Sequence, residues 1–190
     1  MNVSPSRQNA LVWKFARAQD VERLEADGGY NEVYTSDGKH YHARAILIAS
    51  GASYRRLDVP GEDNFIGRDS FLRHLRWSIL YGRKNIIVVG GGNSACEEGL
   101  HLTTFAEKVT LLVRGDTLTA SQIAIDKINE PTSRVEVKFN VAVDSFEGEN
   151  SKLKKINFHD SATGEKDEIK PEAAFIFIGQ NPSRIRKKIP

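Results

Sequence analysis

The sequence predicts an α/β protein whose core is a parallel sheet of the doubly wound type. The segment NIIVV at 85–89 reads as a buried strand, breaks into three glycines and continues with helical spacing. KVTLLV follows that helix as a second strand, so the segment is typical of one strand–helix–strand half of such a sheet. A last strand, AAFIFIG, is apolar on both faces, as expected for a sheet covered on both sides. Together these patterns favour a Rossmann-like doubly wound parallel sheet.

Bulk composition limits the function classes. The 190 residues suffice for one full domain and part of a second. The formal charge of +2, from 27 basic and 25 acidic residues, favours neither nucleic acid nor an anionic membrane as a partner. The first residues lack the apolar core of a signal peptide, and no apolar run approaches the roughly 20 residues of a membrane helix. We therefore expect a soluble, cytoplasmic protein with no membrane partner.

Residues 20–50 predict a β-meander. DVERLEA, YNEVYTS and HYHARAILIAS alternate in the way of strands, and Asp-Gly turns separate them. The last of these segments ends in Ala45–Ala49, which is apolar on both faces. We therefore expect Ala45–Ala49 to form a strand buried between layers.

A crossing between domains is expected next. ASYRRLDVPGEDNFIGRD, residues 52–69, is rich in glycine, proline and charge, which is typical of a linker. We place a boundary near Asp69, which divides the chain into residues 1–68, 69–182 and a basic tail, 183–190. FLRHLRWSILYG at 71–82 predicts a short helix with a solvated basic face.

The remaining segments predict an insertion followed by the last strand of the sheet. LTASQIAIDKI at 118–128 predicts a further helix. The segments RVEVKFN, VAVDSFEG, KLKKINFHD and EKDEIKP then predict short strands, with HDSATGEK as a turn. Because AAFIFIG returns afterwards to a buried strand, these strands are expected to form a β-meander inserted into the α/β domain.

The glycine turn GGGNSA matches a dinucleotide-binding fingerprint. Gly90 would allow the tight turn, Gly92 would let the backbone approach a pyrophosphate, and the small Ala95 would let the helix pack on the strand. The phosphates would lie at the positive end of the helix. The sequence thus predicts a nicotinamide dinucleotide as ligand, with this set of candidate binding residues: Gly90, Gly91, Gly92, Asn93, Ser94 and Ala95.

The end of the next strand indicates which dinucleotide binds. An acidic residue there is typical of NAD proteins, and an arginine is typical of NADP proteins. Here the strand ends at Arg114, about 20 residues beyond the glycines. NADPH is therefore favoured, although Asp116 would favour NADH if the turn brought it inward.

Other chemistries have little support in the sequence. Cys96 is the only cysteine, which excludes an intrachain disulfide, a CxxC pair and a cysteine-rich zinc site. We expect it to be a small buried residue rather than a nucleophile. His74, His101 and His159 are scattered without metal-ligand spacing, and no serine lies in a G-x-S-x-G elbow. We therefore predict no catalytic residue and no metal site.

These motifs, in this order, resemble the thioredoxin reductase family of pyridine nucleotide and flavin oxidoreductases. IASGASYRRLDVPGED is similar to the family's crossing, GGGNSACEEG to its fingerprint and FIFIGQNPS to its closing loop. The resemblance implies that residues 1–68 are part of an FAD domain and that residues 69–182 bind NAD(P)H. It also implies that the loop Ile178, Gly179 and Gln180 guides the nicotinamide end.

The departures from the family pattern restrict the expected activity. The positions of the cysteine pair in disulfide-reducing members fall on Arg73 and Arg76. The family's arginine cluster for the 2′-phosphate is reduced to Arg114, with Thr119 in the last arginine's place. The strand and glycine turn that bind the FAD pyrophosphate in the family, and its GD segment near the flavin, are not found in these residues. We therefore expect FAD only in a complete enzyme.

The resulting hypothesis is an NADPH-binding module that delivers hydride to FAD in a complete enzyme and has no dithiol active site. The chain alone is expected to be inactive. The alternative is a non-catalytic NADP(H)-binding regulatory or interaction module. The expected partners are a nicotinamide dinucleotide and either a second copy of the chain or the missing half of the FAD domain, with no role for nucleic acid.

Overall fold

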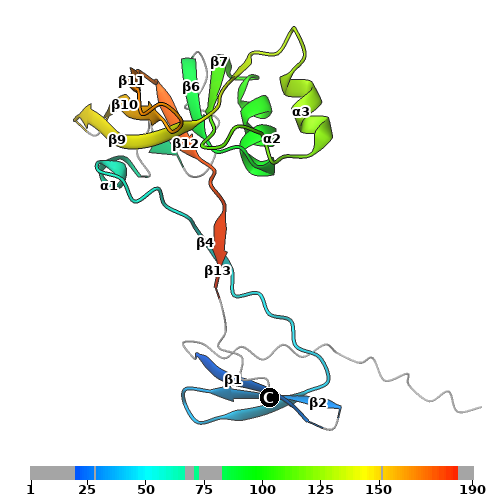
Figure 1. The fold of residues 1–190 in the computed structure, drawn as a ribbon. Coiled ribbons are helices and arrows are strands. Elements are labelled where there is room, and N and C mark those ends of the chain that lie inside the picture. The colour runs from blue at the N-terminus through cyan, green and yellow to red at the C-terminus, as the bar shows by residue number, and fades with distance from the viewer. Residues whose placement is uncertain (1–19, 28, 67–70, 73–82, 151, 184–190) are drawn as a thin grey trace, which may run out of the picture. The chain divides into compact units, whose positions relative to one another are not determined.

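The computed structural model describes residues 20–27, 29–66, 71–72, 83–150 and 152–183 (Figure 1). The chain divides into two compact units. The smaller unit comprises Met1–Ala52 and Pro182–Pro190, and the larger unit comprises Ser53–Asn181. The chain thus passes between the units twice.

The smaller unit contains an antiparallel three-stranded sheet. Its strands β1 (Val21–Asp27), β2 (Tyr30–Thr35) and β3 (His40–Ala43) lie side by side in that order. Gly29 and Gly38 in the connecting turns have φ angles of 94° and 76°, which glycine adopts at little cost. The predicted hairpins with Asp-Gly turns are confirmed.

The predicted buried strand at Ala45–Ala49 is wrong. The last strand of this sheet, β3, ends at Ala43, and residues 44–50 belong to no strand. Leu47 is 92% exposed and Ile48 is 53% exposed. Apolar character on both faces predicts burial only where a neighbouring strand and covering layers exist. The described part of the smaller unit supplies neither to these residues.

The larger unit contains a parallel sheet with the strand order β5-β12-β6-β7-β8. This confirms the predicted α/β class with a Rossmann-like parallel sheet. Phe71–Leu72 form a strand, so the predicted helix is wrong for these residues, while residues 73–82 lie outside the described part. The sheet strands are β5 (Phe71–Leu72), β6 (Arg83–Val89), β7 (Ala106–Leu112), β8 (Val135–Lys138) and β12 (Ala173–Ile176).

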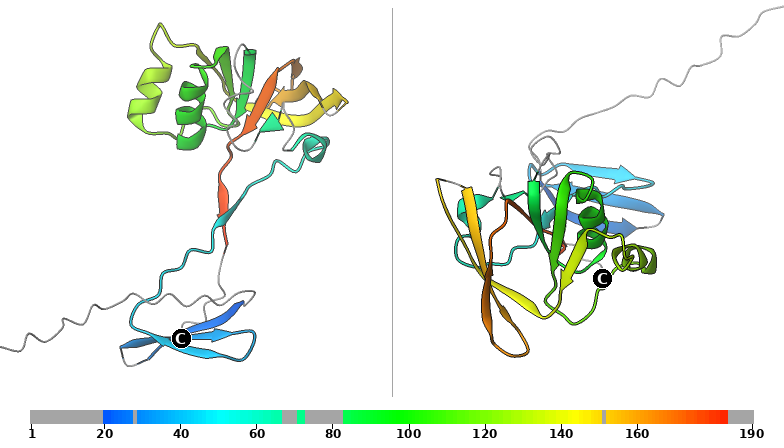
Figure 2. Two further views of the ribbon diagram at one scale, coloured as in Figure 1. Left: turned by 180° about the vertical axis from the view of Figure 1, so that it is seen from behind. Right: turned by 90° about the horizontal axis from the view of Figure 1, so that it is seen from above.

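Different layers cover the two faces of this sheet (Figures 1 and 2). Helices α2 (Asn93–Leu102) and α3 (Gln122–Ile128) cover one face. The other is covered by an antiparallel sheet of β9 (Val141–Glu149), β10 (Lys152–Asp160) and β11 (Lys166–Ile169), which are three of the four strands predicted for the inserted meander. The prediction is wrong for the remaining segment, RVEVKFN, because its strand β8 pairs in parallel with β7. The inserted strands thus occupy the face on which a fully doubly wound fold would carry helices.

The central strand β6 supplies both halves of the core. Ile86 and Val88 pack toward the helices, whereas Ile87 and Val89 pack toward the inserted meander. Since successive side chains of a strand point to opposite faces, one apolar run fills both halves. Each such side chain contributes about 1.5–3 kcal/mol when fully buried.

The crossing segment packs with the larger unit. It contains β4 (Ala52–Tyr54) and the short helix α1 (Glu62–Phe65). Phe65 is buried in the cluster on the meander side of the sheet, and Leu57, Val59 and Ile66 pack against that cluster. The boundary predicted near Asp69 lies outside the described residues, as does the tail at 184–190, so that division stays a prediction.

Candidate functional site

The glycine turn between β6 and α2 is fixed by contacts that exclude a side chain. Gly90 has a φ angle of 140°, and a Cβ there would lie 2.3 Å from the carbonyl oxygen of Phe177. A Cβ on Gly91 would lie 2.7 Å from Cγ1 of Val113. The turn therefore needs glycine at its first position for the steric reason that the sequence predicts.

Gly92 differs because it faces open space. A Cβ there would meet only Oγ1 of Thr119, at 3.9 Å, and the φ angle of −90° is one that any residue adopts. Gly92 is the N-cap of α2, and no side chain caps the helix. The first backbone N–H groups of a helix have no intrahelical acceptor and carry partial positive charge. Gly92 thus leaves room for an anion in front of those groups.

Small residues hold α2 close to β7. Ala95 is fully buried, and a Cβ on Gly99 would lie 3.1 Å from Cδ1 of Leu111. The fingerprint pattern predicts this close approach for Ala95 alone. The contact of Gly99, one turn further along the helix, was not predicted. It could have been inferred from the sequence, because a glycine on the apolar side of a predicted helix indicates close packing.

The loop after β7 is tied to the glycine turn by hydrogen bonds. The Thr119 backbone N–H donates to the Gly91 carbonyl at 2.8 Å. The Ser121 backbone N–H donates to Oδ1 of Asn93 at 2.6 Å. The Asn93 side chain therefore holds this loop, while Ser94 beside it is exposed at the start of the helix.

The parallel strands bring the sequence-predicted residues to one edge of the sheet. Val89 of β6 is in register with Leu112 of β7 and with Ile176 of β12. All these strands run in the same direction, so their carboxyl ends lie side by side. The glycine turn therefore emerges between the segment carrying Arg114 and the segment 178–180, at the edge where open α/β sheets bind ligands.

Arg114 follows the end of β7 and is exposed. Among the described residues its guanidinium makes no ion pair, and its backbone carbonyl accepts a hydrogen bond of 3.5 Å from the Ser161 hydroxyl. Asp116, the residue that would favour the other dinucleotide, is also exposed. The arginine is thus accessible to a ligand phosphate.

The loop after β12 is held by a residue that the sequence analysis did not single out. Ile178 packs against the core, whereas Gly179 and Gln180 are exposed. The Arg55 backbone N–H donates to the Gly179 carbonyl at 3.0 Å, and its Nε donates to Oδ1 of Asn181 at 3.1 Å. Arg55 therefore positions this loop. In the sequence, Arg55 is an arginine of the crossing segment far from this loop, so nothing in the sequence links the two.

Cys96 is fully buried on α2, as predicted. Burial raises the pKa of its thiol, and the charge of Glu97 raises it further. A thiol with a raised pKa is a poor nucleophile at neutral pH. Cys96 therefore acts as a small core residue.

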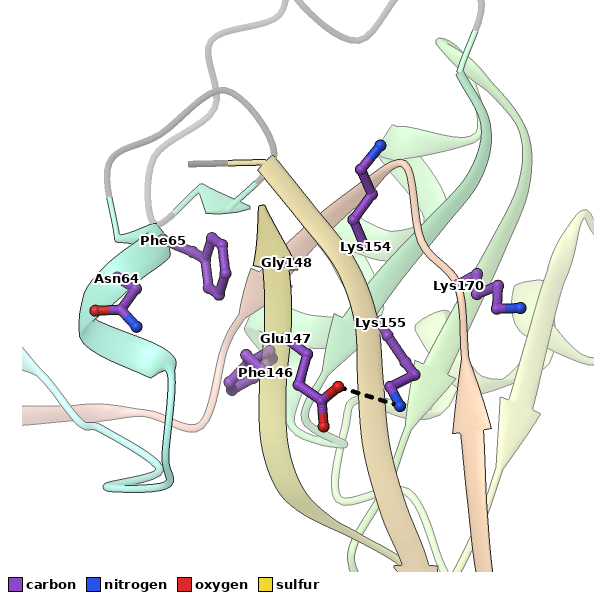
Figure 3. A pocket seen from close by; sticks show the side chains of 8 residues that line it. All are labelled: Asn64, Phe65, Phe146, Glu147, Gly148, Lys154, Lys155 and Lys170. Atoms are coloured by element: carbon purple, nitrogen blue, oxygen red, sulfur yellow. Dashed lines mark ion pairs between the residues drawn. The ribbon is translucent and has the colours of Figure 1, made fainter. Parts of the chain in front are cut away.

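A pocket of about 750 Å³ lies elsewhere in the larger unit (Figure 3). It is lined by residues of α1, β9, β10 and the loop after β11, and two of these residues, Glu147 and Lys155, form an ion pair of 3.1 Å. None of the residues of the glycine turn or of the loops beside it lines this pocket. We therefore place the candidate site at the glycine turn and not in this pocket.

In the part of the chain that the structure describes, no helix has the length and apolar character to cross a membrane.

Comparisons with known proteins agree with the fold and the motifs. Residues 7–188 match the family described as pyridine nucleotide-disulphide oxidoreductase. Thioredoxin reductase of Bacillus subtilis is 38% identical over 156 residues, which are 82% of this chain and 49% of that protein. Thioredoxin reductase of Listeria monocytogenes is 34% identical over 163 residues, which are 86% of this chain and 50% of that protein. The chain thus spans about half the length of the curated relatives it matches.

Solved structures give the same result. The crystal structure of thioredoxin reductase from Streptococcus pyogenes has a TM-score of 0.69 and 32% identity, and the match covers 86% of this chain and 53% of that one. Thioredoxin reductase from Giardia duodenalis has a TM-score of 0.74 and 26% identity, with 90% of this chain and 55% of that one covered.

Proposed function

Since this chain belongs to the pyridine nucleotide-disulphide oxidoreductase family, and is thioredoxin reductase-like, we propose that its larger unit binds NADPH at the glycine turn. In a complete enzyme, a nucleotide held there would supply hydride to FAD. The observation that carries the proposal is the open space at Gly92, in front of an uncapped helix and between two strand ends. This arrangement fits a pyrophosphate.

Each part of the site has a separate role in this proposal. The N–H groups at the start of α2, around Asn93, Ser94 and Ala95, bind the pyrophosphate. The loop Ile178–Gln180 orients the nicotinamide end, and Arg55 holds that loop through the Gly179 carbonyl. The protein thus binds and orients the nucleotide, and the cofactors perform the redox chemistry.

Arg114 selects NADPH over NADH in this proposal. It is exposed at the end of β7, and none of the described acidic residues forms an ion pair with it. An arginine at this position binds the 2′-phosphate that only NADPH carries. This chain has a single arginine where thioredoxin reductases resembling it have an arginine cluster. The preference for NADPH over NADH is therefore expected to be modest.

No dithiol of this chain relays the electrons in this proposal. Cys96 is the only cysteine of the chain and is buried. The described residues also include no second glycine turn leading from a buried strand into a helix, so they do not fit the FAD pyrophosphate. We therefore assign the anion site on α2 to the nicotinamide nucleotide, and FAD to other residues of a complete enzyme.

The test is calorimetric titration of the purified chain with NADPH and with NADH. Gly92→Ala is expected to weaken binding of both nucleotides at least about tenfold, because the new Cβ occupies the space for the pyrophosphate. Arg114→Ala is expected to weaken NADPH binding by about tenfold while leaving NADH binding unchanged, since a charge-assisted contact of an exposed side chain lies at the lower end of about 1.5–3 kcal/mol.

Thermal unfolding of each variant is the control. Gly92→Ala places its Cβ no closer than 3.9 Å to a neighbour, so its midpoint should match that of the wild type. Wild-type protein that binds neither nucleotide would overturn the proposal. Equal losses of NADPH and NADH in Arg114→Ala would overturn the role given to this arginine.

A further inference from the structure

A group of metal-binding residue types lies on the sheet of the smaller unit, away from the glycine turn. His40 and His42 are two residues apart on β3, so their side chains share a face of the sheet. Glu32 of β2 is directly opposite His42 in the strand register, and Tyr34 is opposite His40. The pairing of β2 with β3 therefore gathers a carboxylate and two imidazoles at one place.

The ligand atoms of these groups lie close together, and some of their separations are near those around a bound metal ion. Nε2 of His40 lies 3.4 Å from Oε2 of Glu32, and Nδ1 of His42 lies 3.6 Å from Oε1 of Glu32. One ligand atom from each residue lies within 4.8 Å of the others. Ligand atoms bound tetrahedrally at about 2.0–2.1 Å are separated by about 3.4 Å. Binding one ion therefore requires side-chain rotations that shorten the longer of these separations.

Tyr34 orients the carboxylate from the side. Its hydroxyl donates a hydrogen bond of 2.7 Å to Oε2 of Glu32, and its ring stacks on His40 with centroids 4.3 Å apart. Tyr34 thus fixes one carboxylate oxygen of Glu32 and leaves the other facing His42, as second-shell partners of metal ligands do.

We propose that Glu32, His40 and His42 form a binding site for a divalent transition-metal ion of the Zn²⁺ type. Two imidazole nitrogens and one carboxylate oxygen are the ligand types that Zn²⁺ and Cu²⁺ prefer, whereas Mg²⁺ prefers oxygen ligands alone. His42 has a side chain that is 60% exposed and His40 one that is 36% exposed. The remaining coordination positions therefore face water.

Such an ion would stabilise a sheet that has little core of its own. Among the described residues of the smaller unit, Leu24 is the only buried hydrophobic side chain. Small units with few buried apolar residues commonly rely on a metal or a covalent link. An ion shared by Glu32, His40 and His42 joins β2 to β3 and stabilises the folded unit in proportion to its binding.

The test titrates the full chain with Zn²⁺ by calorimetry and compares single-residue variants. His42→Ala and Glu32→Gln are each expected to weaken Zn²⁺ binding at least about tenfold, because each removes a ligand. His159→Ala is the matched control. His159 is also a partly exposed histidine beside a carboxylate, with Nδ1 2.7 Å from Oδ1 of Asp144, but it lies outside the cluster. This control should bind Zn²⁺ as the wild type does.

The electron paramagnetic resonance spectrum of bound Cu²⁺ gives a second readout. We expect coupling to two nitrogen nuclei in the wild type and to one in His42→Ala, with unchanged circular dichroism in both. Binding that survives in His42→Ala and Glu32→Gln, or that is lost equally in His159→Ala, would overturn the proposal. Wild-type protein without measurable Zn²⁺ binding would overturn it as well.

Discussion

At the scale of single residues, Gly61 shows how the backbone of one element fixes the residue type in another. Gly61 precedes α1 with a φ angle of 84°, and a Cβ there would lie 1.9 Å from the carbonyl oxygen of Phe146. The backbone of β9 thus occupies the space of any side chain. The next residue, Glu62, is fully buried and accepts a hydrogen bond of 2.9 Å from the Asp58 backbone N–H. Gly61 and Glu62 together set the path of the crossing segment over β9.

Gly61→Ala is expected to destabilise the larger unit by about 2–4 kcal/mol, from a strained backbone and a clash that requires β9 to move. The measurement is the free energy of unfolding in urea. Gly164→Ala is the control because Gly164 has a φ angle of 76° but no atom within 4 Å of the new Cβ. It should cost only about 1–2 kcal/mol. Equal effects of the two substitutions would show that the contact with Phe146 has no energetic weight.

The sequence predicted residues that act through local chemistry and missed those that act across the fold. Gly90 and Gly92 could be identified because a strand, a glycine turn and a helix follow one another directly. The role of Arg55 could not be predicted in this way, because Arg55 meets Gly179 only after the chain folds. Likewise, Glu32 comes opposite His42 only through the register of two strands.

At the scale of elements, the turn between β2 and β3 depends on ionised Asp37. The side chains of Lys39 and Thr35 donate hydrogen bonds to this carboxylate, the latter at 2.6 Å. These bonds, with that from Lys39 as the largest cause, lower the pKa of Asp37 to about 2 from an ordinary 3.8. A depressed folded-state pKa means that the stabilisation is complete above the unfolded value and is lost as the pH falls through the folded value.

Wild-type protein should therefore lose stability in the β2–β3 turn as the pH falls from about 4 to about 2. In Asp37→Asn, the stability of the turn should change less with pH over this range. The turn should also be less stable than in the wild type at neutral pH. Amide chemical shifts of β2 and β3, followed by NMR against pH, provide the measurement. Because Lys39 has a side chain that is 58% exposed, salt should reduce the effect. An unchanged titration in the variant would contradict the assignment.

Helices and strands could be predicted where the sequence pattern alone determines them. The prediction failed where the structure of a segment depends on a neighbouring strand. The β6–α2–β7 unit and the strands of the inserted meander follow from hydrophobic periodicity and turn residues. Ala45–Ala49 has the same apolar pattern as β12, yet it forms no strand, whereas β12 lies between β5 and β6. An apolar pattern shows that a segment could form a buried strand. Whether it does so depends on neighbouring strands and covering layers, which the segment itself does not specify.

At the scale of the whole molecule, the two units differ in how much apolar surface they bury. The larger unit has a core on each face of its parallel sheet, whereas the described part of the smaller unit buries Leu24 as its only hydrophobic side chain. Local opening is governed by the buried contacts of each cooperative unit, so the units are expected to open with different free energies.

Amides of β1, β2 and β3 should therefore exchange with deuterium at least about a hundredfold faster than those of β6, β7 and β12. Hydrogen exchange followed by mass spectrometry at neutral pH measures both sets in one sample. The comparison uses only amides that are hydrogen-bonded within their own sheet, because β1 and β3 are edge strands with further N–H groups that the sheet leaves unpaired. Val88→Ala, in the core of the larger unit, serves as a control and should accelerate exchange in β6, β7 and β12 while leaving the smaller unit unchanged. Equal protection of the two sheets, or acceleration of both by Val88→Ala, would mean that the chain opens as one cooperative unit.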